Sequence, residues 1–163
     1  MNKQIDMFKN NAEVELQHPV EIHVDGASRD NPGISGAGIY IHYPDNRTKS
    51  LSYYLGKKTN NQAEYLALIF ALLEMDVRDE LRIFSDSELL VKQIHGDYQV
   101  KNGNIKNLYT YACRLLKKFK YTIRHIDREH NKKADKLANL AIDKKIEVSD
   151  ELKEKLLSED IQL

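Results

Sequence analysis

The sequence predicts an α/β fold: a five-stranded mixed sheet, with three antiparallel strands followed by two parallel ones, and helices on both faces. Three short runs that alternate apolar and polar residues come first in the chain, as in an antiparallel meander. Segments with helical spacing of apolar residues then alternate with two further short strands. The chain has 163 residues, of which 41% are hydrophobic, enough for one compact domain with a core.

The meander is predicted from the first third of the chain. Residues 20–24 alternate apolar and polar and stop at the turn pair Asp25-Gly26. A second such run occupies residues 39–43. Turn residues at 44–46 separate it from a third strand at 48–55, so the three strands follow one another with short connections.

The rest of the chain alternates helices with two more strands. Apolar residues recur at helical spacing in four segments, which predict helices over residues 62–75, 87–94, 105–119 and 131–142. Short β-rich runs predict the fourth and fifth strands at 81–85 and 121–126. Helices inserted between strands in this way pack on the faces of the sheet.

The ends of the chain differ from its centre. Residues 1–19 form a polar leader without the apolar segment of a secretory signal, and residues 145–163 form an acidic, weakly amphipathic tail. We therefore place the domain at residues 20–144. No apolar run reaches the roughly 18 residues that span a bilayer, and the single Cys113 excludes a disulfide framework. We expect a cytoplasmic monomer that does not bind membranes.

Charge is distributed unevenly, although the formal net charge is zero. Residues 101–136 contain 11 Lys and Arg against three acids, a net charge of +8. A basic second half beside an acid-rich first half suits a polyanion handled near carboxylates. A solvated helical face is the alternative interpretation.

Four acids are candidates for chemistry. Asp25 and Asp86 end two predicted strands, and open α/β sheets place their sites at the carboxyl ends of strands. The alternatives are an ordinary turn for Asp25 and a helix cap for Asp86. Glu64 lies near the start of an apolar helix, where a favourable first-turn acid is the alternative. Asp135 lies among lysines, where a surface ion pair or an N-terminal helix charge is the alternative.

Carboxylates that converge without Cys or clustered His favour a hard cation such as Mg²⁺ or Mn²⁺. Two such ions about 3.5–4 Å apart can activate water and stabilise the leaving oxygen of a phosphodiester. Paired carboxylates also occur in glycoside hydrolases, whose sugar clefts are usually lined with aromatic residues. This chain has no Trp and a basic second half, which favours a phosphate substrate.

Four motifs in order resemble the type 1 ribonuclease H family: DGASRDNPG at 25–33, TNNQAE at 59–64, SDS at 85–87 and NKKADKLAN at 131–139. The resemblance spans about residues 20–144 and implies a ribonuclease H-like fold. It implies an endonuclease that hydrolyses the RNA strand of RNA/DNA hybrids with two Mg²⁺ or Mn²⁺ ions. The catalytic and metal-binding set that it implies is Asp25, Glu64, Asp86 and Asp135.

The resemblance also implies substrate contacts. Asn60 and Asn61 match an Asn pair that reaches the minor groove, where 2′-hydroxyls distinguish RNA from DNA. A helix N-cap is the alternative for one of them. Asn31 and Thr59 match positions that help bind a DNA phosphate, although Asn31 also fits the turn Asn-Pro-Gly. Glycines permit a close approach of the backbone to substrate or to a neighbouring strand at Gly33, Gly36 and Gly38.

The sequence departs from the best-studied bacterial members of the family in two places. Their Lys- and Trp-rich helix that grips the DNA strand is replaced here by residues 95–103 alone. Binding of the DNA strand must therefore depend on other basic residues, for which we propose Lys101, Lys106, Arg114, Lys117 and Lys118. The loop 127–131 is also shorter, as in the handle-less branch of the family.

In that short loop His130 or Arg128 is a candidate auxiliary residue for proton transfer or product release. An exposed His at the start of a helix is the alternative for His130. Two other functions remain open at this point: a non-catalytic module that binds hybrids, and another nuclease of the superfamily. Resolvases and integrases of that superfamily lack the Asn-Asn-x-x-Glu helix start.

Overall fold

The computed structural model describes residues 18–163 and contains the predicted five-stranded sheet. The strand order is β3-β2-β1-β4-β5, with β1, β2 and β3 antiparallel and with β4 and β5 parallel to β1. The strands are β1 Val20–Ser28, β2 Gly33–His42, β3 Thr48–Lys58, β4 Glu80–Ser85 and β5 Lys120–His125. The predicted fold class is confirmed.

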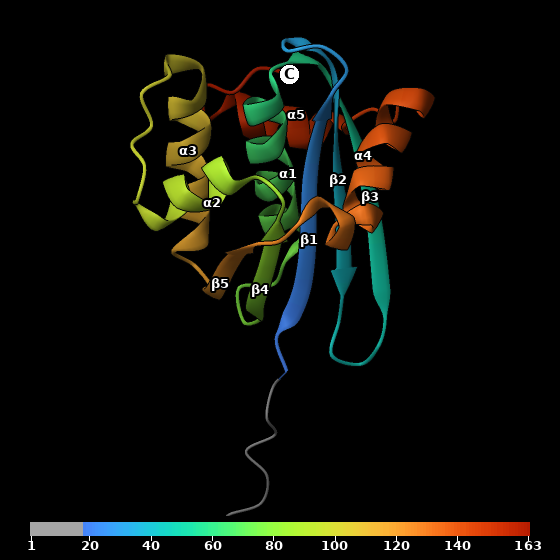
Figure 1. Cartoon of the computed structure of the whole chain (residues 1–163), viewed down its shortest axis with the longest axis vertical. Helices are drawn as coiled ribbons and strands as arrows, with labels where there is room; N and C mark the ends of the chain where they lie inside the picture. Colours follow the sequence, from blue (N-terminus) through green and yellow to red (C-terminus); the bar gives the residue numbers. More distant parts are fainter. Residues whose placement is uncertain (1–17) are drawn as a thin grey trace, which may run out of the picture.

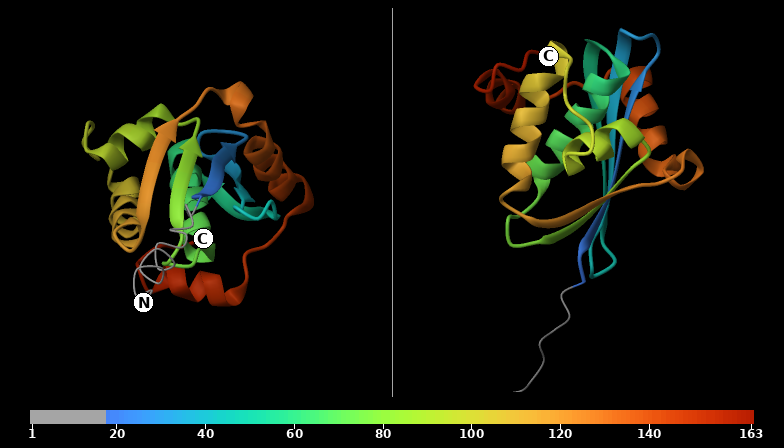
Figure 2. Two further views of the ribbon diagram at one scale, coloured as in Figure 1. Left: turned by 90° about the horizontal axis from the view of Figure 1, so that it is seen from below. Right: turned by 60° about the vertical axis from the view of Figure 1, so that its left-hand side comes forward.

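Helices cover both faces of the sheet (Figures 1 and 2). One face carries α1, α2 and α3, and the other carries α4 (Figure 1). Their bounds are α1 Asn60–Glu74, α2 Glu88–His95, α3 Gly103–Leu116, a short 3₁₀ turn η2 Arg128–His130, α4 Lys132–Lys144 and α5 Asp150–Leu157. No helix within residues 18–163 is long and apolar enough to cross a membrane.

The first strand is longer than its alternating pattern predicts. It does not stop at Asp25-Gly26 but stays paired with β2, from Asp25 opposite Gly38 to Ser28 opposite Ser35. The longer β2 provides this pairing, because it begins at Gly33 rather than at residue 39. Asp25 therefore lies inside a strand, and a turn is the wrong interpretation for it.

Helix α1 is buried on all sides. Ten consecutive residues, from Ala63 to Leu72, are buried between the sheet and α3. A helix that is apolar around its whole circumference has to be covered in this way. The only acid in that buried run is Glu64, so the core itself fixes the position of its backbone.

Helix α4 approaches the sheet unusually closely. A Cβ atom on Gly38 would lie 2.0 Å from the carbonyl oxygen of Ala134, and one on Gly36 would lie 2.2 Å from that of Ala138. These two glycines therefore make room for a helix. The interpretation that they admit substrate or a neighbouring strand is wrong, because the close partner lies across the sheet face.

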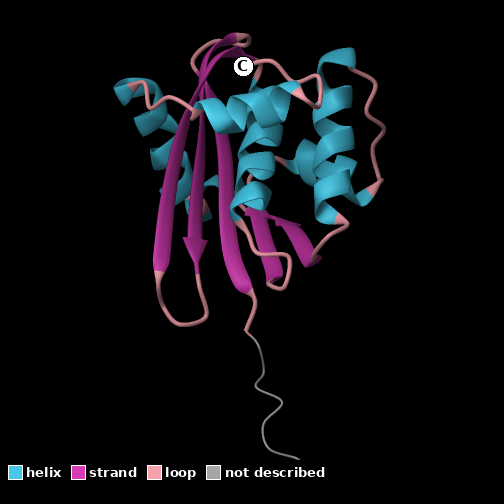
Figure 3. Ribbon diagram, turned by 180° about the vertical axis from the view of Figure 1, so that it is seen from behind, coloured by secondary structure: helices cyan, strands magenta, loops and turns pink. Residues whose placement is uncertain are grey.

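The C-terminal residues pack on the domain. The amide of Tyr54 in β3 donates to the carbonyl of Ile146 at 2.7 Å, and Leu156 and Ile161 are buried in the core. Figure 3 shows α5 running across the direction of the strands. A domain boundary at residue 144 stays a prediction, and the predicted leader lies, up to residue 17, outside the described residues.

Candidate active site

A cleft of about 640 Å³ opens where β4 ends against β1 and the N-terminus of α1. All four predicted carboxylates line it, and so do most of the predicted substrate residues. The lining residues include Asp25, Glu64, Asp86, Asp135, Asn31, Thr59, Asn60, Asn61 and Arg128.

Three carboxylates form a compact cluster in this cleft. Asp25 comes from β1, Glu64 from α1 and Asp86 from the residue after β4. One carboxylate oxygen from each lies within 4.8 Å of the other two. Asp25 is 5% exposed and Glu64 is 9% exposed, so they have little water to stabilise their charges.

The local structure excludes the alternative roles of Glu64 and Asp86. Glu64 lies beyond the first turn of α1, which contains no acid, so a favourable first-turn charge does not explain it. The N-cap of α2 is Ser87, whose hydroxyl accepts from the amide of Leu90, so Asp86 is not a cap. Neither a first-turn charge nor a helix cap therefore explains these two acids in the cleft.

Burial and the neighbouring carboxylates raise the pKa values of Asp25 and Glu64. Burial raises the pKa of Asp25 most, and the neighbouring Glu64 and Asp86 charges raise it further. Burial also raises the pKa of Glu64, followed by the charge of Asp86. Carboxylates that oppose one another in this way need a cation nearby to ionise together.

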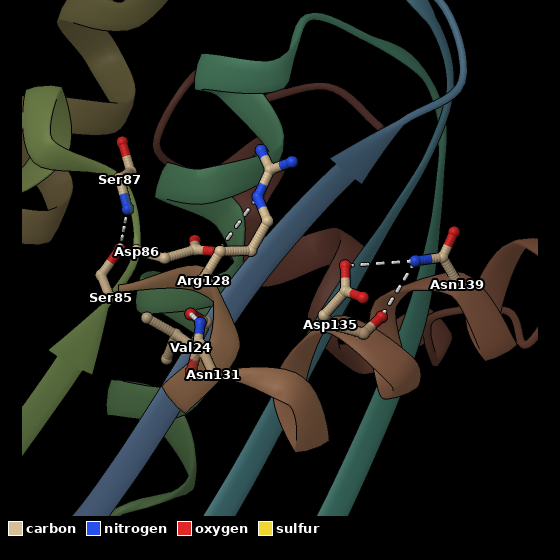
Figure 4. Close-up of polar contacts among 8 residues, drawn as sticks. All are labelled: Val24, Ser85, Asp86, Ser87, Arg128, Asn131, Asp135 and Asn139. Carbon is tan, nitrogen blue, oxygen red and sulfur yellow. Dashed lines mark hydrogen bonds and ion pairs between the residues drawn. The ribbon is translucent and has the colours of Figure 1, made fainter. Parts of the chain in front are cut away.

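Asp135 lies beside the cluster rather than within it. It occupies the first turn of α4 and is only half-buried. The Asp135 side chain lies close enough to that of Asp25 to hydrogen-bond with it, which adds to the rise in the pKa of Asp25. Figure 4 shows the carboxylate of Asp135 held by Asn139, whose amide nitrogen lies 3.4 Å from it. No ion pair to Asp135 occurs among residues 18–163, so the surface ion pair is excluded there.

The donor set fits a hard divalent cation. The cluster offers only carboxylate oxygens, which Mg²⁺ and Mn²⁺ prefer. Within residues 18–163 the Glu64 Oε2 atom is buried without a hydrogen-bond partner, although a buried charged oxygen without one is costly. A cation bound here would satisfy that oxygen and offset the repulsion in the cluster.

The Asn pair is free for recognition. Thr59 caps α1 in a capping box: its hydroxyl accepts from the Gln62 amide at 3.1 Å, and the Gln62 side chain accepts from the Thr59 amide at 2.9 Å. The N-cap interpretation of Asn60 and Asn61 is therefore wrong. The Asn61 side-chain oxygen is buried and has no hydrogen-bond partner among the described residues, in a cleft that both Asn residues line.

Asn31 lies next to this helix start. Its side-chain oxygen accepts from the backbone amide of Asn60 at 3.1 Å. The loop between β1 and β2 is thereby tied to the N-terminus of α1. Asn31 and Thr59 line the same cleft, although the Thr59 hydroxyl is already engaged in the cap.

The structure distinguishes between the two auxiliary candidates, Arg128 and His130. Arg128 lines the cleft, and its Nε atom lies 3.9 Å from the Asp86 carboxylate (Figure 4). His130 is exposed at the end of η2 and lines a different pocket, with His23 and Tyr40. The structure therefore brings Arg128, and not His130, to the carboxylates.

Lys117 and Lys118 lie outside the cleft. They follow α3, which runs from its start near Asn102 at the cleft to the beginning of β5. The carboxylates lie where the parallel strand β4 ends, so these lysines lie toward the opposite end of the sheet (Figure 1). Both are exposed.

Sequence reasoning missed some residues of the site. Leu89 and Asn102 line the cleft, and nothing in their local sequence distinguishes them from surface residues. The role of the buried Asn131 side chain was also missed, although Asn131 opens the fourth motif. Its position four residues before Asp135 was the available signal.

Comparisons with known proteins identify the family of this chain. The family model described as reverse transcriptase-like matches residues 23–141. A bifunctional protein of Mycobacterium tuberculosis is 37% identical over 130 residues, which cover 76% of this chain and 35% of that protein. The chain thus spans about a third of the length of that relative.

Solved structures match the fold over nearly their whole length. RNase H1 from Halobacterium salinarum has a TM-score of 0.71 at 34% identity, covering 78% of this chain and 99% of that one. LC11-RNase H1 in complex with an RNA/DNA hybrid has a TM-score of 0.71 at 36% identity, covering 77% and 98%. With these matches and the family model over most of its length, this chain belongs to the type 1 ribonuclease H family of enzymes.

Proposed function

We propose that the protein is a metal-dependent endonuclease that hydrolyses the RNA strand of RNA/DNA hybrids. The observation that carries the proposal is the buried cluster of Asp25, Glu64 and Asp86 in a cleft rimmed by Asn60 and Asn61. Membership of the ribonuclease H family, and a similar protein solved with an RNA/DNA hybrid, support this substrate.

The carboxylates would hold two Mg²⁺ or Mn²⁺ ions, with Asp25, Glu64 and Asp86 as the central ligands and Asp135 beside them. When bound, such ions activate water and stabilise the leaving oxygen of the cleaved phosphodiester. The chain itself fixes the four carboxyl groups on β1, α1, the end of β4 and α4, and so determines where the scissile phosphate is cut.

The start of α1 orients the hybrid over these carboxylates. Asn60 and Asn61 are side-chain amides that can both donate and accept, which suits base edges and 2′-hydroxyls in the wide minor groove. Asn31 and Thr59 line the same cleft, and we assign the contact with the DNA strand to them. Reading both strands at one helix start distinguishes a hybrid from duplex DNA.

Arg128 supplies a positive charge at the edge of the cluster. Its side chain is 90% exposed, whereas that of Asp86 is 8% exposed, so the guanidinium faces the incoming strand. We propose that Arg128 binds a phosphate of the RNA strand and partly offsets the negative charge of the cleft. His130 has no such position.

Cleavage of a labelled hybrid, with Mg²⁺ or Mn²⁺ and then with EDTA, tests the proposal. We expect RNA-strand products that disappear with EDTA and with Asp86→Asn, because a neutral ligand cannot replace the carboxylate. Asp79→Asn, which changes a half-buried acid in the turn before β4 and outside the cleft, is the matched control and should retain activity.

Duplex DNA, duplex RNA and a junction substrate belong in the same assay. Hybrid binding without metal-dependent cleavage would show a non-catalytic binding module instead. Cleavage of duplex DNA at the rate of the hybrid would refute the assigned substrate.

A further inference from the structure

Asn131 is an almost fully buried polar residue at the start of α4. It is 1% exposed, and its side-chain nitrogen donates to the carbonyl oxygen of Val24 at 2.9 Å (Figure 4). Val24 directly precedes Asp25 in β1. The bond joins two segments that are 107 residues apart in the chain.

The bonded carbonyl lies where the pairing between β1 and β4 ends. The last pair of these parallel strands is Val24 with Ser85, and the next residue along β4 is Asp86. The Asn131 side chain therefore contacts the β1 backbone one residue before Asp25, beside the strand end that Asp86 follows.

On the other side, Asn131 holds the first turn of α4. It is the N-cap residue, but its side chain makes no capping hydrogen bond. Its carbonyl oxygen instead accepts from the backbone amide of Asp135 at 3.1 Å. One residue thus binds β1 through its side chain and the Asp135 turn through its backbone.

The contacts between α4 and the sheet beyond this turn include few directional bonds. Ala134 and Ala138 lie against Gly38 and Gly36, a contact that fixes distance but not orientation. Farther along, the Ser52 hydroxyl donates to the carbonyl of Leu137 at 2.7 Å. Near Asp135, the Lys133 ammonium also donates to the Tyr40 hydroxyl of β2 at 3.2 Å, and the Asp135 side chain itself meets that of Asp25. The Asn131 bond differs from both because it joins the start of α4 to the backbone of β1.

We propose that Asn131 is a positioning residue: its bond to Val24 sets the place of the α4 N-terminus, and so of Asp135, relative to Asp25. Its side-chain oxygen has no hydrogen-bond partner within residues 18–163, and a buried amide left half-satisfied is costly to stability. We therefore assign Asn131 a role in positioning α4 rather than in stabilising the fold. The proposal rests on the proposed function, in which Asp135 serves the carboxylate site.

Steady-state kinetics on a labelled hybrid test it with Asn131→Ala and Asn131→Ser. Serine keeps a good N-cap but is too short to reach Val24, so in Asn131→Ser α4 should still begin at the same residue while its first turn loses the anchor to β1. We expect kcat to fall about 10- to 100-fold in both variants while KM stays within about twofold, because displaced catalytic groups cost rate rather than binding.

The matched control is Ile142→Val, near the other end of α4, which loosens packing without touching the anchor. This variant should lower Tm and keep the wild-type kcat. If the Asn131 variants lower Tm to a similar extent and also keep kcat, Asn131 is merely structural and the proposal is wrong.

Amide hydrogen exchange gives a readout that does not depend on cleavage. In Asn131→Ser, exchange at the Asp135 amide should accelerate about tenfold, while exchange at Ile142 stays as in the wild type. Wild-type protein that fails to cleave a hybrid would refute the proposed function alone. Unchanged exchange at Asp135 would refute the role of Asn131 in either case.

Discussion

Helices α1 and α4 each bring one predicted carboxylate to the cleft, but they are built in opposite ways. Helix α1 is buried along ten consecutive residues, and Glu64 is among them. Helix α4 is amphipathic and buries only four residues, Ala134, Ala138, Ala141 and Ile142. The core therefore fixes Glu64, whereas Asp135 depends on a few local bonds.

Their N-termini differ in the same way. Thr59 uses its side chain to cap α1, which leaves Asn60 and Asn61 for other contacts. Asn131 stands at the equivalent position of α4 but uses its side chain to bind β1. Similar residue types before a helix thus serve different purposes, and only the surrounding sheet distinguishes them.

The largest effect on the cleavage rate is expected when the acid that each of the two helices contributes, Glu64 or Asp135, is neutralised. Glu64→Gln removes a central, buried ligand, and we expect the single-turnover rate on a hybrid to fall at least about 1,000-fold. Asp135→Asn removes a carboxylate beside the cluster and should cost about 10- to 100-fold. Equal losses of rate in the two variants would show that Glu64 and Asp135 contribute equally to cleavage, and would contradict the distinction between a central carboxylate and one beside the cluster.

The helix start of α1 should show an intermediate effect. One or two lost hydrogen bonds in Asn60→Ala/Asn61→Ala predict a 5- to 150-fold fall in kcat/KM, from about 1–3 kcal/mol, with little change in Tm. Thr59→Ala removes the cap and should cost about 1 kcal/mol of stability, or about 2–4 °C in Tm. A Tm loss in the Asn double variant with wild-type kinetics would defeat the recognition role.

Without metal, removing the charge of Asp25 should make the protein more stable, although the same change removes a carboxylate of the active site. Burial and the neighbouring carboxylates raise the pKa of Asp25, so its charged form disfavours the folded state. This cost is absent below about pH 4, the unfolded-state pKa, and grows as the pH rises above it. In EDTA at pH 8, Asp25→Asn should therefore raise Tm by about 3–6 °C, corresponding to about 1–2 kcal/mol.

Thermal melts of both variants check this prediction. Asp135→Asn should leave Tm near the wild-type value, because Asp135 is only half-buried. The gain of Asp25→Asn should shrink toward pH 4 and also when Mg²⁺ stabilises the wild type. A Tm for Asp25→Asn below that of the wild type at pH 8 would contradict the unfavourable charge assigned to the cluster.

The smallest effect is expected from a third helix, α3. Its 14 residues correspond to a length of about 21 Å, so Lys117 and Lys118 can contact only a hybrid that extends well beyond the cleft. Lys117→Ala/Lys118→Ala should lower the salt dependence of binding for a hybrid of about 24 base pairs and not for one of about 8, because each phosphate contact releases counterions. Equal slopes for wild type and variant on the long hybrid would leave these lysines merely solvated.

The sequence by itself determined the fold class, the order of the elements and the four acids. Apolar spacing is a local property, and it predicted the sheet and the helices because each element must bury one face or all of it. Motif order then selected Asp25, Glu64, Asp86 and Asp135, which indeed line one cleft. Strand ends were predicted less well, because β1 continues only where β2 is there to pair with it.

Only the tertiary structure decided how each of these residues is used. Whether Arg128 or His130 faces the cluster depends on atoms that are distant in the chain. The bond from Asn131 to Val24 spans most of the domain. Such contacts leave no local pattern, because folding, and not spacing, brings their partners within hydrogen-bond distance.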